Sequence, residues 1–271
     1  MDYPIGVIDS GVGGLTVARE LMRQLPKENL IYVGDTLRCP YGPRPEEEVV
    51  EFTWDMVNFL LEKNIKMLVI ACNTATAFTL EELKQKLDIP VVGVIEPGAR
   101  AAIKTTKTNH IGVLGTEGTI RSHAYRKALK NINSELEIEG LACPTFVPMV
   151  EKGVVSGPLA RQVVQDALTP LKDWKAMDTL ILGCTHYPII KPVIEEVIGE
   201  SVEVISSGDE TAREVSAILG FKRKLYEGDR PVNHQFFASG DTHLFMKIAN
   251  MWLQRPVNEV GRIQLGSKQS I

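Results

Sequence analysis

The sequence predicts an α/β protein made of two pseudo-symmetric halves, each with a mainly parallel central sheet. Along the 271 residues, short apolar runs of strand length alternate with longer segments of helix length. Two of these runs, residues 67–72 and 180–184, end in a cysteine that is followed by polar residues and a helix-like segment. Residues 111–116 also repeat the pattern of residues 5–10. The two repeats have similar spacing along the chain, which indicates a duplicated α/β unit.

The composition is that of an ordinary globular protein, with 44% hydrophobic and 24% charged residues. A net charge of −4 and the lack of a Lys/Arg-rich block predict no nucleic-acid partner. The apolar runs are too short to cross a bilayer, and the N-terminal residues do not resemble a signal peptide. We therefore expect no membrane partner, a cytoplasmic location and reduced cysteines.

The first half is predicted from its apolar runs and its turn residues. Continuous apolar runs are typical of buried parallel strands, and apolar residues at helical spacing indicate amphipathic helices. The elements expected in order are a strand at 5–9, a Gly-rich turn, a helix closed by Pro26, a strand at 30–33, a Pro-rich loop at 35–45, a helix at 46–63, a strand before Cys72, a helix at 74–87 and a strand at 91–95 that ends at Glu96-Pro97-Gly98.

The second half is predicted to begin at His110 and to be inserted into the first. The elements expected in order are strands at 111–116, 180–183 and 202–205, a helix at 210–219 and a strand at 235–241. We expect the last strand to return to the first sheet. The predicted domains are then 1–97 plus 208–271, which is discontinuous, and 98–207. The tail beyond about Arg255 has no clear periodicity, so we expect poor order there.

Cys72 and Cys184 are the main candidates for chemistry. Buried cysteine is usually a small structural hydrophobe, and that interpretation stays open. However, both cysteines come at the carboxyl end of a predicted strand, where ligands bind in open α/β sheets. Each also precedes a helix, whose N-terminus stabilises a thiolate. Cys39, in the Pro-rich loop, and Cys143, before Pro144, lack this setting and are interpreted as structural or incidental.

Several polar residues near the two cysteines are candidate partners. His186 is either a cap or metal ligand or, more consistently with one neighbouring cysteine, a proton partner of Cys184. Asp9 either caps the following helix or handles a proton or a substrate ammonium at the sheet edge. The Gly-rich turn after Asp9 lacks the dinucleotide-binding spacing, so we interpret it as a nest for a small carboxylate. Further donors that could converge on carboxylates are Tyr41-Gly42, Asn73-Thr74 and residues 116–119. Glu151 is either solvated surface or close to the second sheet edge.

With these motifs in view, the chain resembles the aspartate/glutamate racemase family from about residue 3 to residue 252. The motifs that carry the resemblance are Val-Ile-Ala-Cys-Asn-Thr-Ala-Thr at 69–76, Leu-Ile-Leu-Gly-Cys-Thr-His-Tyr-Pro at 180–188, Asp-Ser-Gly-Val-Gly-Gly-Leu at 9–15, Tyr-Gly at 41–42 and Ala-Ser-Gly-Asp at 238–241. Cys-Thr-His in the second motif points to glutamate, because family members that act on aspartate typically have an acidic residue at His186.

The resemblance implies two α/β domains with the active site in the cleft between them, and a cofactor-independent proton transfer at the α-carbon of glutamate. Cys72 and Cys184 would be the acid/base pair, with Cys184 acting on L-glutamate and Cys72 on D-glutamate. Asp9 would assist Cys72, and His186, with Glu151, would assist Cys184. No motif for pyridoxal phosphate or metal is evident, so we expect neither.

Substrate contacts would come from Asp9, Ser10, Tyr41, Gly42, Asn73, Thr74, Thr185 and His186. The implied role is the supply of D-glutamate for peptidoglycan, and we expect a homodimer. Other interpretations stay open: a racemase for aspartate or hydantoins, a decarboxylase, which usually keeps only one of the two cysteines, or a two-lobed small-molecule binding module.

Overall fold

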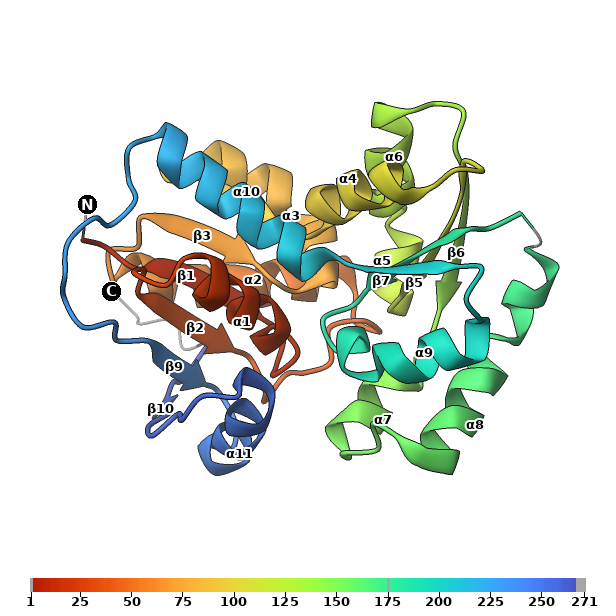
Figure 1. Cartoon of the computed structure of the whole chain (residues 1–271). Coiled ribbons are helices and arrows are strands. Elements are labelled where there is room, and N and C mark those ends of the chain that lie inside the picture. The colour runs from red at the N-terminus through yellow and green to blue at the C-terminus, as the bar shows by residue number, and fades with distance from the viewer. Residues whose placement is uncertain (1, 175, 267–271) are drawn as a thin grey trace.

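The computed structural model describes residues 2–174 and 176–266, which fold around two separate sheets, each entirely parallel (Figure 1). The first sheet has the order β10-β9-β2-β1-β3-β4, and the second has the order β6-β5-β7-β8. The strands are β1 (Ile5–Asp9), β2 (Leu30–Gly34), β3 (Met67–Ile70), β4 (Val91–Gly93), β5 (His110–Gly115), β6 (Glu137–Ala142), β7 (Thr179–Gly183), β8 (Glu203–Ser206), β9 (Gln235–Ala238) and β10 (Gly261–Arg262). The predicted α/β class is confirmed.

Helices alternate with these strands and cover both faces of each sheet. They are α1 (Leu15–Gln24), α2 (Glu46–Leu61), α3 (Asn73–Lys86), α4 (Ile95–Thr105), α5 (Glu117–Arg121), α6 (Ala124–Ile132), α7 (Phe146–Glu151), α8 (Gly157–Ala167), α9 (Lys191–Ile198), α10 (Ser207–Phe221) and α11 (Thr242–Leu253), with short 3-10 helices η1 (Thr169–Asp173) and η2 (Tyr187–Ile190). No helix in the described ranges has the length and apolar content needed to cross a membrane.

The central strands are apolar on both faces because each face meets a different layer of helices. In β1, Val7 packs into the core beneath α1, α10 and α11, whereas its neighbour Ile8 packs into the core beneath α2 and α3. In β3, Val69 and Ile70 alternate in the same way. Burying each such side chain contributes about 1.5–3 kcal/mol, so burial on both faces holds these strands in the centre of the sheet.

Two helices connect the sheets, and the chain then returns to the first one. α4 follows β4 and packs against the second sheet, while α10 follows β8 and packs against α1 and α4 (Figure 1). β9 lies parallel to β2, with Ile31 opposite Gln235. The predicted return of this strand is therefore confirmed, and the second sheet is built entirely from residues 110–206. The domain bounds at 97/98 and 207/208 stay a prediction.

The structure differs from three expectations about secondary structure. The strand predicted at 235–241 ends at Ala238, and Asp241 instead caps α11 through its side chain. The strand predicted at 91–95 ends at Gly93, and Glu96-Pro97-Gly98 opens α4 instead of ending a strand. Pro97 lies in the first turn of the helix, where its missing N–H has no intrahelical role. The tail prediction is wrong for residues 256–266, because β10 pairs with β9 and Ile263 is buried. Residues 267–271 lie outside the described ranges.

Candidate active site

Cys72 and Cys184 lie at the carboxyl ends of two equivalent inner strands and meet at one cavity. Cys72 follows β3, and Cys184 follows β7. The cavity between them has a volume of about 20 Å³. Its other lining residues are Ser10, Cys39, Pro40, Tyr41, Gly42, Asn73, Thr74, Thr116, Val147, Thr185 and His186. All the site residues predicted from the sequence line it, except Asp9 and Glu151. This volume holds about one water molecule, so part of the wall must move before a larger ligand can enter.

Cys72 is the N-terminal cap of α3, as its position before a helix predicted. Its sulfur accepts a hydrogen bond from the Ala75 N–H at 3.4 Å, and Sγ donates to the Ser10 hydroxyl at 3.6 Å. Burial nevertheless raises the pKa of Cys72 to about 11, and the nearby charge of Asp9 adds to the rise. The helix N–H lowers the pKa, as expected from the sequence, but the loss of hydration is the larger effect.

Cys184 belongs to a chain of three polar side chains. Its sulfur lies 4.0 Å from His186 Nδ1, and His186 Nε2 lies 3.2 Å from Glu151 Oε1. Burial raises the pKa of Cys184 well above that of a free thiol, and the hydrogen bond with His186 lowers the pKa of Glu151. The ring of Trp252, on α11, packs edge-on against His186 with centroids 6.2 Å apart. Glu151, on the short helix α7, therefore contacts the ring nitrogen of His186 that is not the one nearest Cys184.

Asp9 is fully buried and joins the two halves behind the cavity. Its Oδ1 accepts from the Gly11 N–H at 3.0 Å, and its Oδ2 accepts from the Thr185 hydroxyl at 3.2 Å. Burial raises the pKa of Asp9, and the charge of His186 opposes that rise. Asp9 is thus hydrogen-bonded to Thr185, the residue after Cys184. Its effect on Cys72 is through its charge, which raises the pKa of that thiol.

The Gly-rich turn packs directly against the second half of the molecule. A Cβ atom on Gly13 would lie 2.3 Å from Thr185 Oγ1 and 2.4 Å from His186 Nδ1. These separations are far below van der Waals contact, so the absence of a side chain at Gly13 is what allows this approach. The turn also aligns the start of α1, whose first residue is Leu15.

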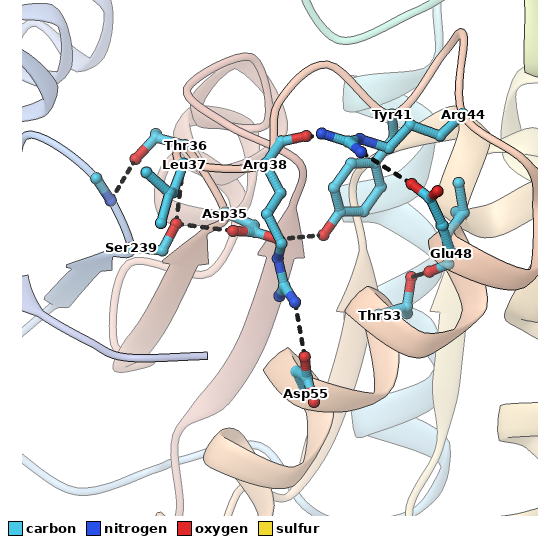
Figure 2. A network of polar contacts seen from close by, with 12 residues as sticks. Asp35, Thr36, Leu37, Arg38, Tyr41, Arg44, Glu48, Thr53, Asp55 and Ser239 are labelled. Atoms are coloured by element: carbon cyan, nitrogen blue, oxygen red, sulfur yellow. Dashed lines mark hydrogen bonds and ion pairs between the residues drawn. The ribbon is translucent and has the colours of Figure 1, made fainter. Parts of the chain in front are cut away.

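Tyr41 reaches the cavity from the Pro-rich loop, but its hydroxyl is already used (Figure 2). It donates to Asp35 Oδ2 at 2.6 Å. Asp35 also accepts from Arg38 Nε at 2.6 Å and from the Ser239 hydroxyl at 2.7 Å. Ser239 follows β9, so the C-terminal part of the chain fixes this loop. This network was not predicted from the sequence, although Asp35 directly follows the apolar strand β2.

Hydroxyl groups from both halves meet at the far wall of the cavity. Thr74 Oγ1, on α3, lies 2.8 Å from Thr116 Oγ1 and 3.2 Å from Thr119 Oγ1. Beside them the Gly118 N–H donates to the Gly42 carbonyl at 2.8 Å. Asn73 is held by the Tyr125 hydroxyl, which donates to its Oδ1 at 2.8 Å. The predicted polar donors do converge, and they do so across the boundary between the halves.

The two remaining cysteines differ from one another. Cys143 is buried in the second core, as expected for a structural thiol. Cys39, which the sequence placed with it, instead forms part of the cavity wall.

Known proteins are similar to this chain in sequence and in fold. The model of the Asp/Glu/hydantoin racemase family matches residues 5–215. A glutamate racemase of Oceanobacillus iheyensis is 64% identical over 254 residues, which cover 94% of this chain and 93% of that protein. The crystal structure of glutamate racemase isoform RacE1 of Bacillus anthracis has a TM-score of 0.93 and 50% identity, over 97% of each chain. That of the Francisella tularensis glutamate racemase in complex with D-glutamate has a TM-score of 0.90 and 33% identity, over 97% of this chain and 98% of that one.

Proposed function

Because this chain belongs to the Asp/Glu/hydantoin racemase family, we propose that it interconverts L-glutamate and D-glutamate. One observation carries the proposal: two cysteines from equivalent strand ends of the two sheets line a single cavity. Groups on opposite sides of a bound amino acid reach opposite faces of its α-carbon. The whole-length identity to glutamate racemases favours glutamate over other amino acids.

The proposed reaction is a two-base proton transfer. The Cys184 thiolate removes the α-proton of L-glutamate, and the Cys72 thiol delivers its proton to the opposite face, which gives D-glutamate. The reverse reaction starts from the Cys72 thiolate. After each turnover one cysteine has gained the proton that the other has lost, so no external oxidant or reductant is needed. A carbanion-like transition state requires carboxylate stabilisation, which backbone N–H groups of the turns after β1 and β3 are suited to supply.

Each thiol must lose its proton before it can act as the base. Burial works against this, since it raises the pKa of both cysteines. His186, 4.0 Å from Cys184, is suited to accept the thiol proton, and Glu151 stabilises the imidazolium that results. Asp9 is the corresponding partner of Cys72. The positive ammonium of the substrate favours the thiolate further once it is bound.

The substrate contacts and the cellular role complete the proposal. Ser10, Tyr41, Gly42, Asn73, Thr74 and Thr185 would hold the carboxylates, with Asp9 and His186 near the reacting carbon. The hydroxyl of Tyr41 is engaged by Asp35, so its contribution would come from the rest of the residue. We further propose that the protein acts in the cytoplasm as a homodimer of two-domain subunits, without cofactor or metal, and supplies D-glutamate for peptidoglycan.

The test is exchange of the α-hydrogen in D₂O across a panel of amino acids, with optical rotation followed in parallel. We expect exchange and loss of rotation with L- and D-glutamate, both before and after dialysis against a chelator. Exchange with aspartate but not with glutamate would contradict the substrate assignment. Activity lost on dialysis and restored by a metal would contradict the thiol-only chemistry.

A further inference from the structure

Cys39 is a third thiol at the cavity, and the proposed reaction does not use it. It lies in the loop after β2 and lines the cavity together with the two proposed bases. Its sulfur lies 3.5 Å from Glu151 Oε1, in hydrogen-bonding contact. Glu151 is on α7, which packs on the second sheet, so this contact crosses from one half of the molecule to the other.

The carboxylate oxygen that contacts Cys39 is the same one that contacts His186. Glu151 Oε1 lies 3.2 Å from His186 Nε2, so the thiol and the imidazole converge on one atom. Gly11 makes room for this arrangement: a Cβ atom there would lie 3.0 Å from Cys39 Sγ and 3.9 Å from Glu151 Oε1. Three segments, the turn after β1, the loop after β2 and α7, therefore meet around the carboxylate.

We propose that Cys39 is a positioning residue, whose thiol donates a hydrogen bond to Glu151 across the cleft and holds that carboxylate against His186. The inference rests on the proposed racemase function, in which His186 serves Cys184. A residue of the first half of the molecule then helps to position the groups that serve the base of the second half. The side chain of Glu151 is 37% exposed, so without this contact water competes for its orientation.

The charges around Cys39 keep its thiol in the donating form. Burial and the charge of Glu151 raise the pKa of Cys39 well above that of a free thiol, with further contributions from Asp9 and Cys72. In turn, the hydrogen bonds from His186 and Cys39 lower the pKa of Glu151. At neutral pH the pair is therefore a neutral donor and an ionised acceptor.

The groups that face His186 come from several different segments. His186 is faced by Glu151, by Cys184 at its Nδ1 side, by the charge of Asp9 and by the uncharged ring of Trp252 on α11. Removal of the Cys39 donor therefore changes the surroundings of Glu151 directly, and those of His186 only through Glu151. The pKa of Glu151 should rise, and the carboxylate should be held less firmly on His186.

The experiment must report on each base separately. L- and D-glutamate have equal free energy in solution, so kcat/KM for racemisation is equal in both directions in every variant. Elimination from glutamate analogues with a leaving group on the β-carbon avoids this constraint. One base takes the α-proton, the leaving group departs with its bonding electrons, and the enamine product hydrolyses to a keto acid. The L-analogue then reports on Cys184, and the D-analogue on Cys72.

The variants are Cys39→Ala, which removes the donor, and Cys39→Ser, which restores one. We expect Cys39→Ala to lower kcat for the L-analogue about fivefold, equivalent to about 1 kcal/mol, and to change the D-analogue less than about twofold. Cys39→Ser should recover most of the loss. The control is Leu37→Ala, in the same loop, because Leu37 is 72% exposed and does not line the cavity. It should match the wild type with both analogues.

A second readout needs no substrate. In protein carrying carboxyl-¹³C glutamate, the Glu151 signal is assigned by its loss in Glu151→Gln and titrated by NMR. Cys39→Ala should shift this titration to higher pH, and Cys39→Ser should shift it back. Equal losses with both analogues, or an unchanged titration, would overturn the role of Cys39 and leave the racemase proposal standing. A wild type that processes neither analogue and does not racemise glutamate overturns the racemase proposal instead, and the titration then still decides whether the Cys39–Glu151 contact exists.

Discussion

Replacement of Gly13 by alanine tests whether the close approach of the two halves is needed for catalysis. The added Cβ would lie 2.3 Å from Thr185 Oγ1, whereas ordinary van der Waals contact begins at 3.4 Å. The turn and the side chains of Thr185 and His186 must therefore move apart by about 1 Å at the site. A displacement of about 1 Å between reacting groups can cost about 100-fold in rate. We expect kcat of Gly13→Ala to fall by that order.

The loss should come from the geometry of the site and not from unfolding. The clash lies between the two halves, so it can be relieved by their separation without disturbing either core. We expect the melting temperature to change by only a few degrees, and alkylation of Cys72 and Cys184 to become faster in Gly13→Ala. The assay is racemisation followed by optical rotation, with thermal unfolding and mass-spectrometric thiol labelling on the same samples.

The matched control is Gly220→Ala in α10. A Cβ atom there meets only a side-chain carbon of Leu225, at 3.7 Å. Alanine is favoured over glycine in a helix by about 1 kcal/mol, so this variant should be at least as stable as the wild type and equally active. A kcat for Gly13→Ala within twofold of the wild type would refute the argument from the close approach.

Three further predictions concern the thiols and the loop network. Cys72→Ser and Cys184→Ser should each lower the rate of racemisation by orders of magnitude. Each variant should retain elimination with one enantiomer of the β-substituted analogue, and the enantiomer should differ between the two variants. Racemisation at the wild-type rate in both variants would contradict the two-base assignment. Burial raises the pKa of Cys72 to about 11, and only the thiolate is alkylated. The alkylation rate at Cys72, measured by peptide mass spectrometry, should therefore rise with pH from neutrality and level off only near that value. A plateau of the rate near pH 9 would contradict this. Ser239→Ala removes a buried donor to Asp35, so urea denaturation should show a loss of about 1–3 kcal/mol in the free energy of unfolding. The exposed control Ser201→Ala should show little change. Equal stability of the two variants would contradict a role for the network.

The parts of the site that follow strand ends were predictable from sequence, because continuous apolar runs locate buried strands and the residues after them share one sheet edge. Cys72 and Cys184 were found in this way. Cys39 was not, because its position depends on the course of a long loop and on its contact with a helix more than a hundred residues later. Local patterns contain no information about such a contact.

The start of α4 and the last strand show two other limits. Pro97 and Gly98 are common both at the ends of strands and in the first turn of a helix, so the sequence alone did not distinguish them. β10 has only two residues, Gly261 and Arg262, too few to show a period. Both elements depend on neighbours that are distant in sequence, β9 for the strand and the second sheet for the helix.

The pairing of β9 with β2 has a consequence for how the protein matures on the ribosome. Asp35 and Ser239 are separated by 204 positions, whereas the second sheet is complete within residues 110–206. Domains generally fold as units while the chain emerges, so the second sheet can assemble while the first still lacks an edge. Until the last strands emerge, the Asp35 carboxylate lacks one of its donors and the loop that bears Cys39 and Tyr41 is not fixed. The cavity is therefore complete only after β9 has emerged and paired, and a chain released before then would contain both proposed bases beside an unfixed loop.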